Sequence, residues 1–194
     1  PWDQRLCLVP NGDLFQAIRQ GKASVVTDHI DTLTEKGVRL KSGKELEADI
    51  LVTATGLNLL ALGGVTFEVD GREMEIPKTV GYKGMMLSDV PNAALCIGYS
   101  NASWTLKVEL TCEFVTDLLK LMDERGYRAC CPRRDPQVGE EPPMDLKSGY
   151  IERSLGYMPS QGAKRPWRLY QNYLFDKISM RPSRIEDGTL TFER

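Results

Sequence analysis

One long amphipathic segment constrains the fold of this chain more than any other feature. Between residues 106 and 125 apolar side chains recur three and four positions apart, and Gly126 follows the segment. This spacing predicts a single long helix, with capping residues within 100–105 ahead of it and a glycine ending it. The stripe expected to face the core consists of Leu106, Leu110, Phe114, Val115, Leu118, Leu119 and Met122.

Much of the chain before this segment has the two-residue period of short strands. After a short predicted helix around 14–18, which Gly21 would end, alternating apolar residues are interrupted by turns at 35–37 and 42–44. This pattern predicts a small antiparallel meander. A second hairpin is predicted around Asp70 and Gly71, a dipeptide typical of tight turns.

Two continuous apolar runs lie close to glycines. Residues 50–52 lead into Ala54, Thr55 and Gly56, and residues 95–99 contain Gly98 and precede the long helix. The first run predicts a strand buried on both faces, and the second predicts another short strand. Such strand ends form the rim of cofactor sites in dinucleotide-binding α/β proteins, but they also occur as plain structural turns. Spacing alone therefore leaves both interpretations open.

The C-terminal third changes character. Residues 131–143 are rich in Pro, Arg, Asp and Glu, which indicates a linker or an exposed loop. Two short helices are predicted at 149–155 and 169–178, and 190–192 could form an edge strand. The whole pattern favours a mixed α/β fold with a helical and loop-rich tail.

Composition excludes several classes of protein. A net charge of −2 offers no electrostatic case for nucleic acid, and no apolar run approaches the roughly 20 residues of a membrane span. Five scattered cysteines and one histidine suggest neither a disulfide framework nor a metal site, so a reducing, cytoplasmic compartment is expected. The chain contains neither a G-x-G-x-x-G motif nor a P-loop to hold a pyrophosphate.

Four stretches together resemble class B flavoprotein monooxygenases of the Baeyer–Villiger type. They are residues 1–7 (PWDQRLC), 23–56 (which end in DILVTATG), 96–107 (CIGYSNASWTLK) and 167–173 (WRLYQNY). The resemblance covers nearly all of the chain but corresponds only to the C-terminal part of such an enzyme. The start at Pro1, without an initiator Met, leads to the same expectation of a piece of something larger.

The resemblance implies a C-terminal part of a flavoprotein with two Rossmann-like domains, one for FAD and one for NADPH. Residues 1–56 would end the NADPH-binding domain, 57–130 would belong to the FAD-binding domain, and 131–194 would form a linker and a helical tail. Ala54, Thr55 and Gly56 would mark the crossing between the two domains. The implied reaction uses O₂ and a peroxyflavin to oxidise a ketone or a thioether.

The resemblance also assigns candidate site residues. Arg5, by itself an ordinary surface arginine, becomes the catalytic candidate, because a fixed guanidinium can stabilise oxyanion charge beside the flavin. Gly98, Asn101, Ser103 and Trp104 would lie against FAD or the substrate.

The phosphate-binding motifs of the family lie upstream of the matched part, so this chain alone is expected to be inactive. Two alternatives stay open, namely a flavin-containing monooxygenase that oxidises nitrogen or sulfur, and a non-catalytic α/β module. A sheet edge left bare by missing strands would favour self-association.

Overall fold

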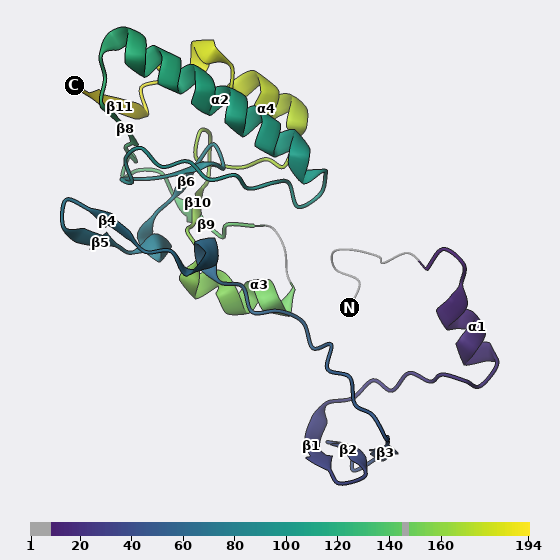
Figure 1. The fold of residues 1–194 in the computed structure, drawn as a ribbon. Helices are drawn as coiled ribbons and strands as arrows, with labels where there is room; N and C mark the ends of the chain where they lie inside the picture. The colour runs from purple at the N-terminus through teal and green to yellow at the C-terminus, as the bar shows by residue number, and fades with distance from the viewer. Residues whose placement is uncertain (1–8, 145–147) are drawn as a thin grey trace. The chain divides into compact units, whose positions relative to one another are not determined.

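The computed structural model describes residues 9–144 and 148–194 of the chain (Figure 1). These residues fall into two compact units, Pro1–Leu57 and Asn58–Arg194, and each unit is described by itself. The division falls within the exposed stretch that follows the predicted Ala-Thr-Gly turn.

The first unit contains a short helix and a three-stranded antiparallel sheet. The helix α1 spans Asp13–Arg19 and buries no residue. The strands β1 (Ile30–Thr34), β2 (Gly37–Leu40) and β3 (Glu45–Glu47) pair in sequence order, which confirms the predicted meander. Gly37 is required here because a Cβ at this position would lie 2.0 Å from the Leu46 carbonyl oxygen.

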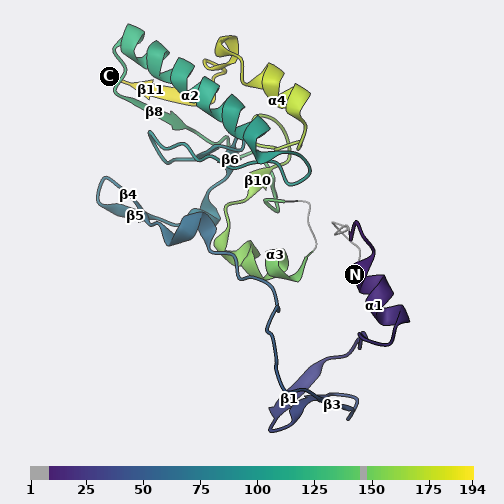
Figure 2. The same cartoon turned by 45° about the vertical axis from the view of Figure 1, so that its right-hand side comes forward.

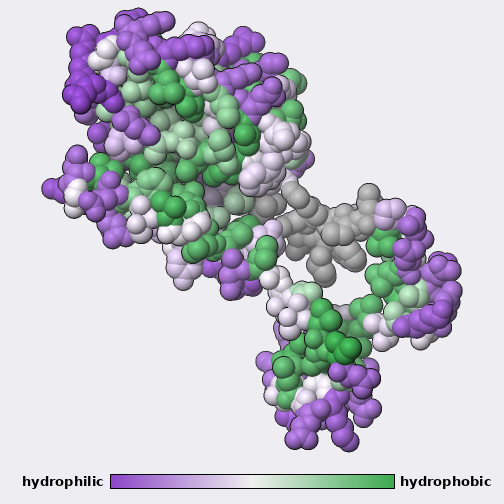
Figure 3. All heavy atoms as spheres, in the orientation of Figure 1, coloured by the Kyte–Doolittle hydropathy of each residue, from purple (hydrophilic) through white to green (hydrophobic). Residues whose placement is uncertain are grey.

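Apolar side chains remain at the surface of this first unit. The meander buries Val38 and Leu40, whereas Ile30 and Leu33 are exposed. Figure 3 shows apolar atoms on the surface of the part that holds the meander. The described residues of this unit thus bury little apolar surface of their own.

The second unit holds four small antiparallel pairs. They are β4 (Phe67–Val69) with β5 (Arg72–Met74), β6 (Gly81–Tyr82) with β7 (Met86–Leu87), β9 (Glu140–Glu141) with β10 (Gln161–Gly162), and β8 (Ala129–Pro132) with β11 (Leu190–Glu193). The first pair confirms the predicted hairpin, and Asp70 and Gly71 both have the positive φ expected of its turn. The last pair confirms the predicted edge strand.

In the described part of the second unit, three α-helices lie at or near the predicted positions. The long helix α2 spans Trp104–Arg125 and ends at Gly126, which is left-handed (φ 65°). The shorter helices are α3 (Gly149–Ser154) and α4 (Tyr173–Ser179), so the last helix begins later than predicted. Figures 1 and 2 show α4 running alongside α2, with which it is in contact.

The buried face of α2 differs from the predicted stripe. Leu110, Phe114, Leu118 and Met122 are buried as expected, but Leu119 is 56% exposed. Two polar residues, Lys107 and Thr111, are buried on this face. The apolar period alone could not place a lysine in the core, because it treats every charged residue as solvated.

The interpretation of residues 131–143 as a linker or an exposed loop was wrong for the residues of this range that are buried, among them Cys131 and Val138. Cys131 lies in β8, and Val138 belongs to the main hydrophobic core. This core also contains Phe114, Trp167 and Leu190, so the tail contributes to the same core as α2. Proline and charged residues had suggested a solvated segment, but pairing of β8 with β11 buries the backbone there.

The fold is therefore mixed α/β, built from small antiparallel sheets and four helices in the described residues. In the part of the chain that the structure describes, no helix is long and apolar enough to cross a membrane.

Candidate functional site

The Ala-Thr-Gly turn lies in the first unit. Residues 50–56 form no strand, and Ile50 and Val52 are 81% and 86% exposed. The prediction of a strand buried on both faces was wrong for the described residues, because no strand of the first unit pairs with this run. Ala54, Thr55 and Gly56 follow it as exposed residues without regular secondary structure, and Gly56 has a φ of 95°.

The remaining described candidates lie together before α2. Residues 95–99 form no strand, which corrects the second strand prediction; the Leu95 N–H donates to the Met85 carbonyl. Gly98 is buried under Trp104, since a Cβ at Gly98 would lie 2.2 Å from the indole Cγ. The glycine therefore allows Trp104, itself 59% exposed, to fold back over the backbone.

The turn after Gly98 is bound to a distant part of the chain. The Ser100 N–H donates to Gln171 Oε1 at 2.9 Å, and Asn101 Nδ2 donates to the Gln171 carbonyl at 3.1 Å. Gln171 itself has a φ of 52°, a left-handed conformation that non-glycine residues seldom adopt. One residue of the tail thus binds two consecutive residues of the candidate segment.

A buried polar network anchors the same segment. The Tyr99 hydroxyl donates to Asp176 Oδ2 at 2.7 Å, and Lys107 Nζ donates to the same oxygen at 3.0 Å. Lys107 also donates to the Lys83 carbonyl at 2.9 Å, and both Tyr99 and Lys107 are fully buried. Burial lowers the pKa of Lys107, an effect that Asp176 opposes, and burial together with the Asp176 hydrogen bond raises the pKa of Tyr99.

A second network of the same chemistry lies close by. The Tyr82 hydroxyl donates to Asp187 Oδ2 at 2.9 Å, and Lys83 Nζ lies 3.2 Å from that oxygen. Burial raises the pKa of Tyr82 and lowers that of Lys83. Sequence reasoning missed both networks, and isolated lysines and aspartates give no pairing signal across roughly 70 to 100 residues of chain.

The N-terminus of α2 is the chemically distinctive part of the candidate segment. Ser103 is the N-cap residue, but its side chain does not cap the helix and instead lies 2.7 Å from the Thr105 hydroxyl. The first N–H groups of a helix carry partial positive charge, which suits electron-rich ligand atoms. The side chains of Asn101, Ser103 and Trp104 are all exposed beside this terminus.

The remaining candidate, Arg5, lies outside the described residues. The structure thus brings Gly98, Asn101, Ser103 and Trp104 together in the second unit and leaves the Ala-Thr-Gly turn in the first. In the described ranges, no group of acidic, histidine or cysteine side chains could hold a metal ion.

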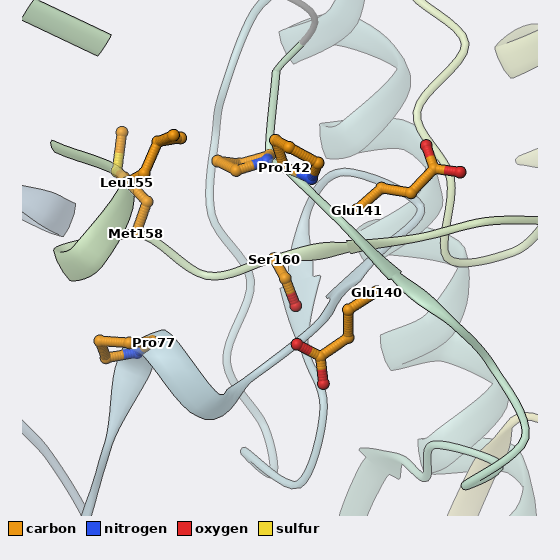
Figure 4. A pocket seen from close by; sticks show the side chains of 8 residues that line it. Pro77, Glu140, Glu141, Pro142, Leu155, Met158 and Ser160 are labelled. Atoms are coloured by element: carbon orange, nitrogen blue, oxygen red, sulfur yellow. The ribbon is translucent and has the colours of Figure 1, made fainter. Parts of the chain in front are cut away.

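A shallow hollow of about 290 Å³ lies elsewhere in the second unit (Figure 4). Its polar side chains already have partners: Glu140 pairs with Arg134, Glu141 pairs with Arg168, and the Ser160 hydroxyl donates to the Thr79 carbonyl. Its lining includes none of the candidate residues, so the hollow adds no chemistry to the site.

Comparison with known proteins matches the entire chain. It is 54% identical over 195 residues to the FAD-containing monooxygenase EthA of Mycobacterium tuberculosis. It is 48% identical over 196 residues to the protein described as "Probable FAD-binding monooxygenase AlmA" of Acinetobacter baylyi, and 47% identical to EthA of Mycolicibacterium smegmatis. Over its whole length the chain is similar to a C-terminal portion of FAD-containing monooxygenases.

The resemblance stated from the sequence is thereby confirmed at the level of the family. The matches cover all of this chain but only 40%, 39% and 40% of the three relatives, so the chain spans about two fifths of their length. No family model matches the chain.

The exposed groups before α2 are chemically compatible with a flavin. An uncapped helix terminus is available to electron-rich atoms, and three polar or aromatic side chains beside it are exposed. The space directly over Gly98 is filled by Trp104, so a ligand would meet the indole there and not the glycine backbone.

Proposed function

We propose that this chain is the C-terminal part of an FAD- and NADPH-dependent monooxygenase that oxidises ketones by Baeyer–Villiger chemistry, sulfur centres by sulfoxidation, or both. The observation that supports this most strongly is 54% identity over the entire chain to an FAD-containing monooxygenase. Because the chain spans 40% of that relative and lacks a phosphate-binding glycine motif, we propose that it is inactive alone. The Rossmann-like domains of the resemblance, ending at 1–56 and 57–130, belong to the same proposal.

Within this proposal the residues of this chain bind and orient the cofactors and the substrate. Ala54, Thr55 and Gly56 line the crossing between the two cofactor domains, and the 98–104 segment presents the N-terminus of α2 with Asn101, Ser103 and Trp104. When bound and reduced by NADPH, FAD supplies the chemistry that activates O₂. The Arg5 guanidinium stays charged at all working pH values and stabilises negative charge that develops on oxygen.

The test replaces Arg5 in the full-length parent protein. Arg5→Ala should abolish oxygenation of a simple ketone and of a thioether while the flavin absorbance stays, because the guanidinium acts on the reaction and not on FAD affinity. Arg19→Ala is a matched control, since Arg19 is an exposed arginine in the last turn of α1. Normal turnover by Arg5→Ala would refute the role of Arg5.

Product analysis separates the two kinds of monooxygenase. Formation of an ester from the ketone supports Baeyer–Villiger chemistry, whereas oxidation of the thioether alone supports a nitrogen- and sulfur-oxidising enzyme. The third alternative is a non-catalytic module that binds no cofactor. A flavin spectrum in the purified chain would contradict the module.

Two further properties belong to the proposal. The free thiols of Cys96, Cys112, Cys130 and Cys131 support a cytoplasmic location, because a reducing compartment preserves thiols. Self-association is proposed because apolar side chains such as Ile50, Val52 and Leu57 are exposed. Light scattering of the purified chain tests the second point, and a strictly monomeric mass would contradict it.

A further inference from the structure

The candidate segment 98–104 combines a fixed backbone with outward-facing side chains. Tyr99 is fully buried and Gly98 is covered by Trp104, whereas Asn101, Ser103 and Trp104 are exposed. A segment that presents groups to a ligand with accuracy needs its backbone held by other parts of the fold. The contacts that hold it therefore decide how those groups are placed.

Those contacts come from the tail. Gln171 accepts the Ser100 N–H and, through its own carbonyl, the Asn101 amide; Asp176 accepts the Tyr99 hydroxyl. Three consecutive residues of the segment are thus bound by two residues that lie 70 to 77 positions further along the chain. We call Gln171 and Asp176 the tail clamp.

The tail clamp is itself rigidly supported. Asp176 lies in the first turn of α4, and Lys107 of α2, whose side chain has no exposed surface, donates to the same carboxylate oxygen as Tyr99. Gln171 precedes Asn172, which caps α4 by accepting the Phe175 N–H at 3.2 Å. Gln171 keeps a left-handed φ of 52°, and such strain persists where the surrounding contacts over-determine the conformation.

We propose that Gln171 and Asp176 are positioning residues that set the 98–104 segment against the bound flavin. This inference rests on the proposed function, because it takes the segment to lie at the flavin. Neither residue needs to touch FAD or substrate, since both act through the backbone and side chains of residues 99–101.

The experiment compares two clamp variants with two chemically matched controls. Gln171→Ala removes the acceptor of the Ser100 N–H, and Tyr99→Phe removes the hydroxyl bound to Asp176 while its pair with Lys107 remains. Gln161→Ala removes a glutamine Oε1 that likewise accepts a backbone N–H, and Tyr82→Phe removes the hydroxyl of the second network. Neither control removes a contact of the 98–104 segment.

The first readout is amide hydrogen exchange in the 194-residue chain. Loss of one hydrogen bond should accelerate exchange within 98–101 about five- to tenfold in the clamp variants at equal melting temperature. The controls should leave exchange there unchanged. Gln171→Glu, which keeps an acceptor oxygen, should restore slow exchange. Equal acceleration by the controls, or none by the clamp variants, would overturn the proposal.

The second readout is the visible circular dichroism of flavin bound to the full-length parent. The clamp variants should change this spectrum and the controls should not, because only the clamp variants shift groups beside the flavin. Accelerated exchange with an unchanged flavin spectrum would overturn the positioning role while leaving the proposed function intact. If the wild-type parent bound no flavin, the proposed function would be refuted. The role of the tail clamp toward the flavin would be refuted with it, whatever the exchange data show.

Discussion

Replacing Lys107 by Met should destabilise the second unit strongly. The Lys107 side chain is fully buried and makes three contacts, to Asp176 Oδ2 at 3.0 Å, to the Lys83 carbonyl at 2.9 Å and to Met180 Sδ at 3.3 Å. Methionine is one heavy atom shorter but keeps an unbranched apolar stem, and it removes all three N–H donors. The change therefore isolates the polar contribution of the ammonium group.

The magnitude follows from what is left behind. Removing one partner of a buried ion pair costs about 3–5 kcal/mol, because the other charge stays buried without compensation. The Asp176 side chain is 12% exposed and keeps the Tyr99 hydroxyl, so partial hydration places the expected loss near the lower end, at about 3 kcal/mol. For a chain of this size that corresponds to a fall in Tm of about 6–12 °C.

A double mutant separates charge burial from packing. Asp176→Asn added to Lys107→Met removes the orphaned carboxylate, and the amide oxygen can still accept from Tyr99. The double variant should therefore recover about 2 kcal/mol relative to Lys107→Met alone. Lys120→Met is the control, because Lys120 lies on the same helix, is 67% exposed and pairs with Asp117. Its loss should change stability by less than about 0.5 kcal/mol.

The assay is guanidinium unfolding followed by the circular dichroism of the helices, to which α2 contributes most. A loss below about 1 kcal/mol in Lys107→Met would show that the buried ammonium contributes little and would refute the reasoning from burial. Full additivity of the Lys107 and Asp176 changes would equally refute it, since two residues in direct contact should be coupled.

Two further changes follow from the same unit. Gly98→Ala should displace Trp104, because the new Cβ would lie 2.2 Å from the indole. A shift in tryptophan fluorescence checks this. Gly156→Ala is the control, because a Cβ there meets nothing within 4 Å. Stability should also depend on pH in the alkaline range. The raised pKa values of Tyr82 and Tyr99 mean that above about pH 10 the unfolded chain loses phenolic protons first, so stability falls as pH rises. The lowered pKa values of the two buried lysines make stability rise with pH up to about pH 10.5, so they offset the first part of this fall. The double Tyr→Phe variant should lose the fall.

Sequence patterns predicted the elements whose determining residues lie within a few positions of one another. The α2 helix, its end at Gly126, the β4–β5 turn at Asp70 and Gly71, and the meander each depend on neighbours in sequence. The buried strand at 50–52 failed for the opposite reason. A strand needs a partner, and the first unit, as described, provides none for it.

The candidate site was only partly predictable for the same physical reason. The glycine before α2 and the helix start could be located from their spacing, and the resemblance drew attention to Asn101, Ser103 and Trp104. Gln171 and Asp176, which bind that segment, could not be found, because no periodicity connects residues some 70 positions apart.

The buried lysines also change how the tail is understood. Lys83 and Lys107 are tolerated in the core only because Asp187 and Asp176 reach them from the last 20 residues of the chain. Since an unpaired buried ammonium is costly, the core around α2 depends on the tail as much as on its own apolar residues. The last residues of the tail thus complete the interior, and Asp176 and Asp187 serve there as partners of the buried lysines.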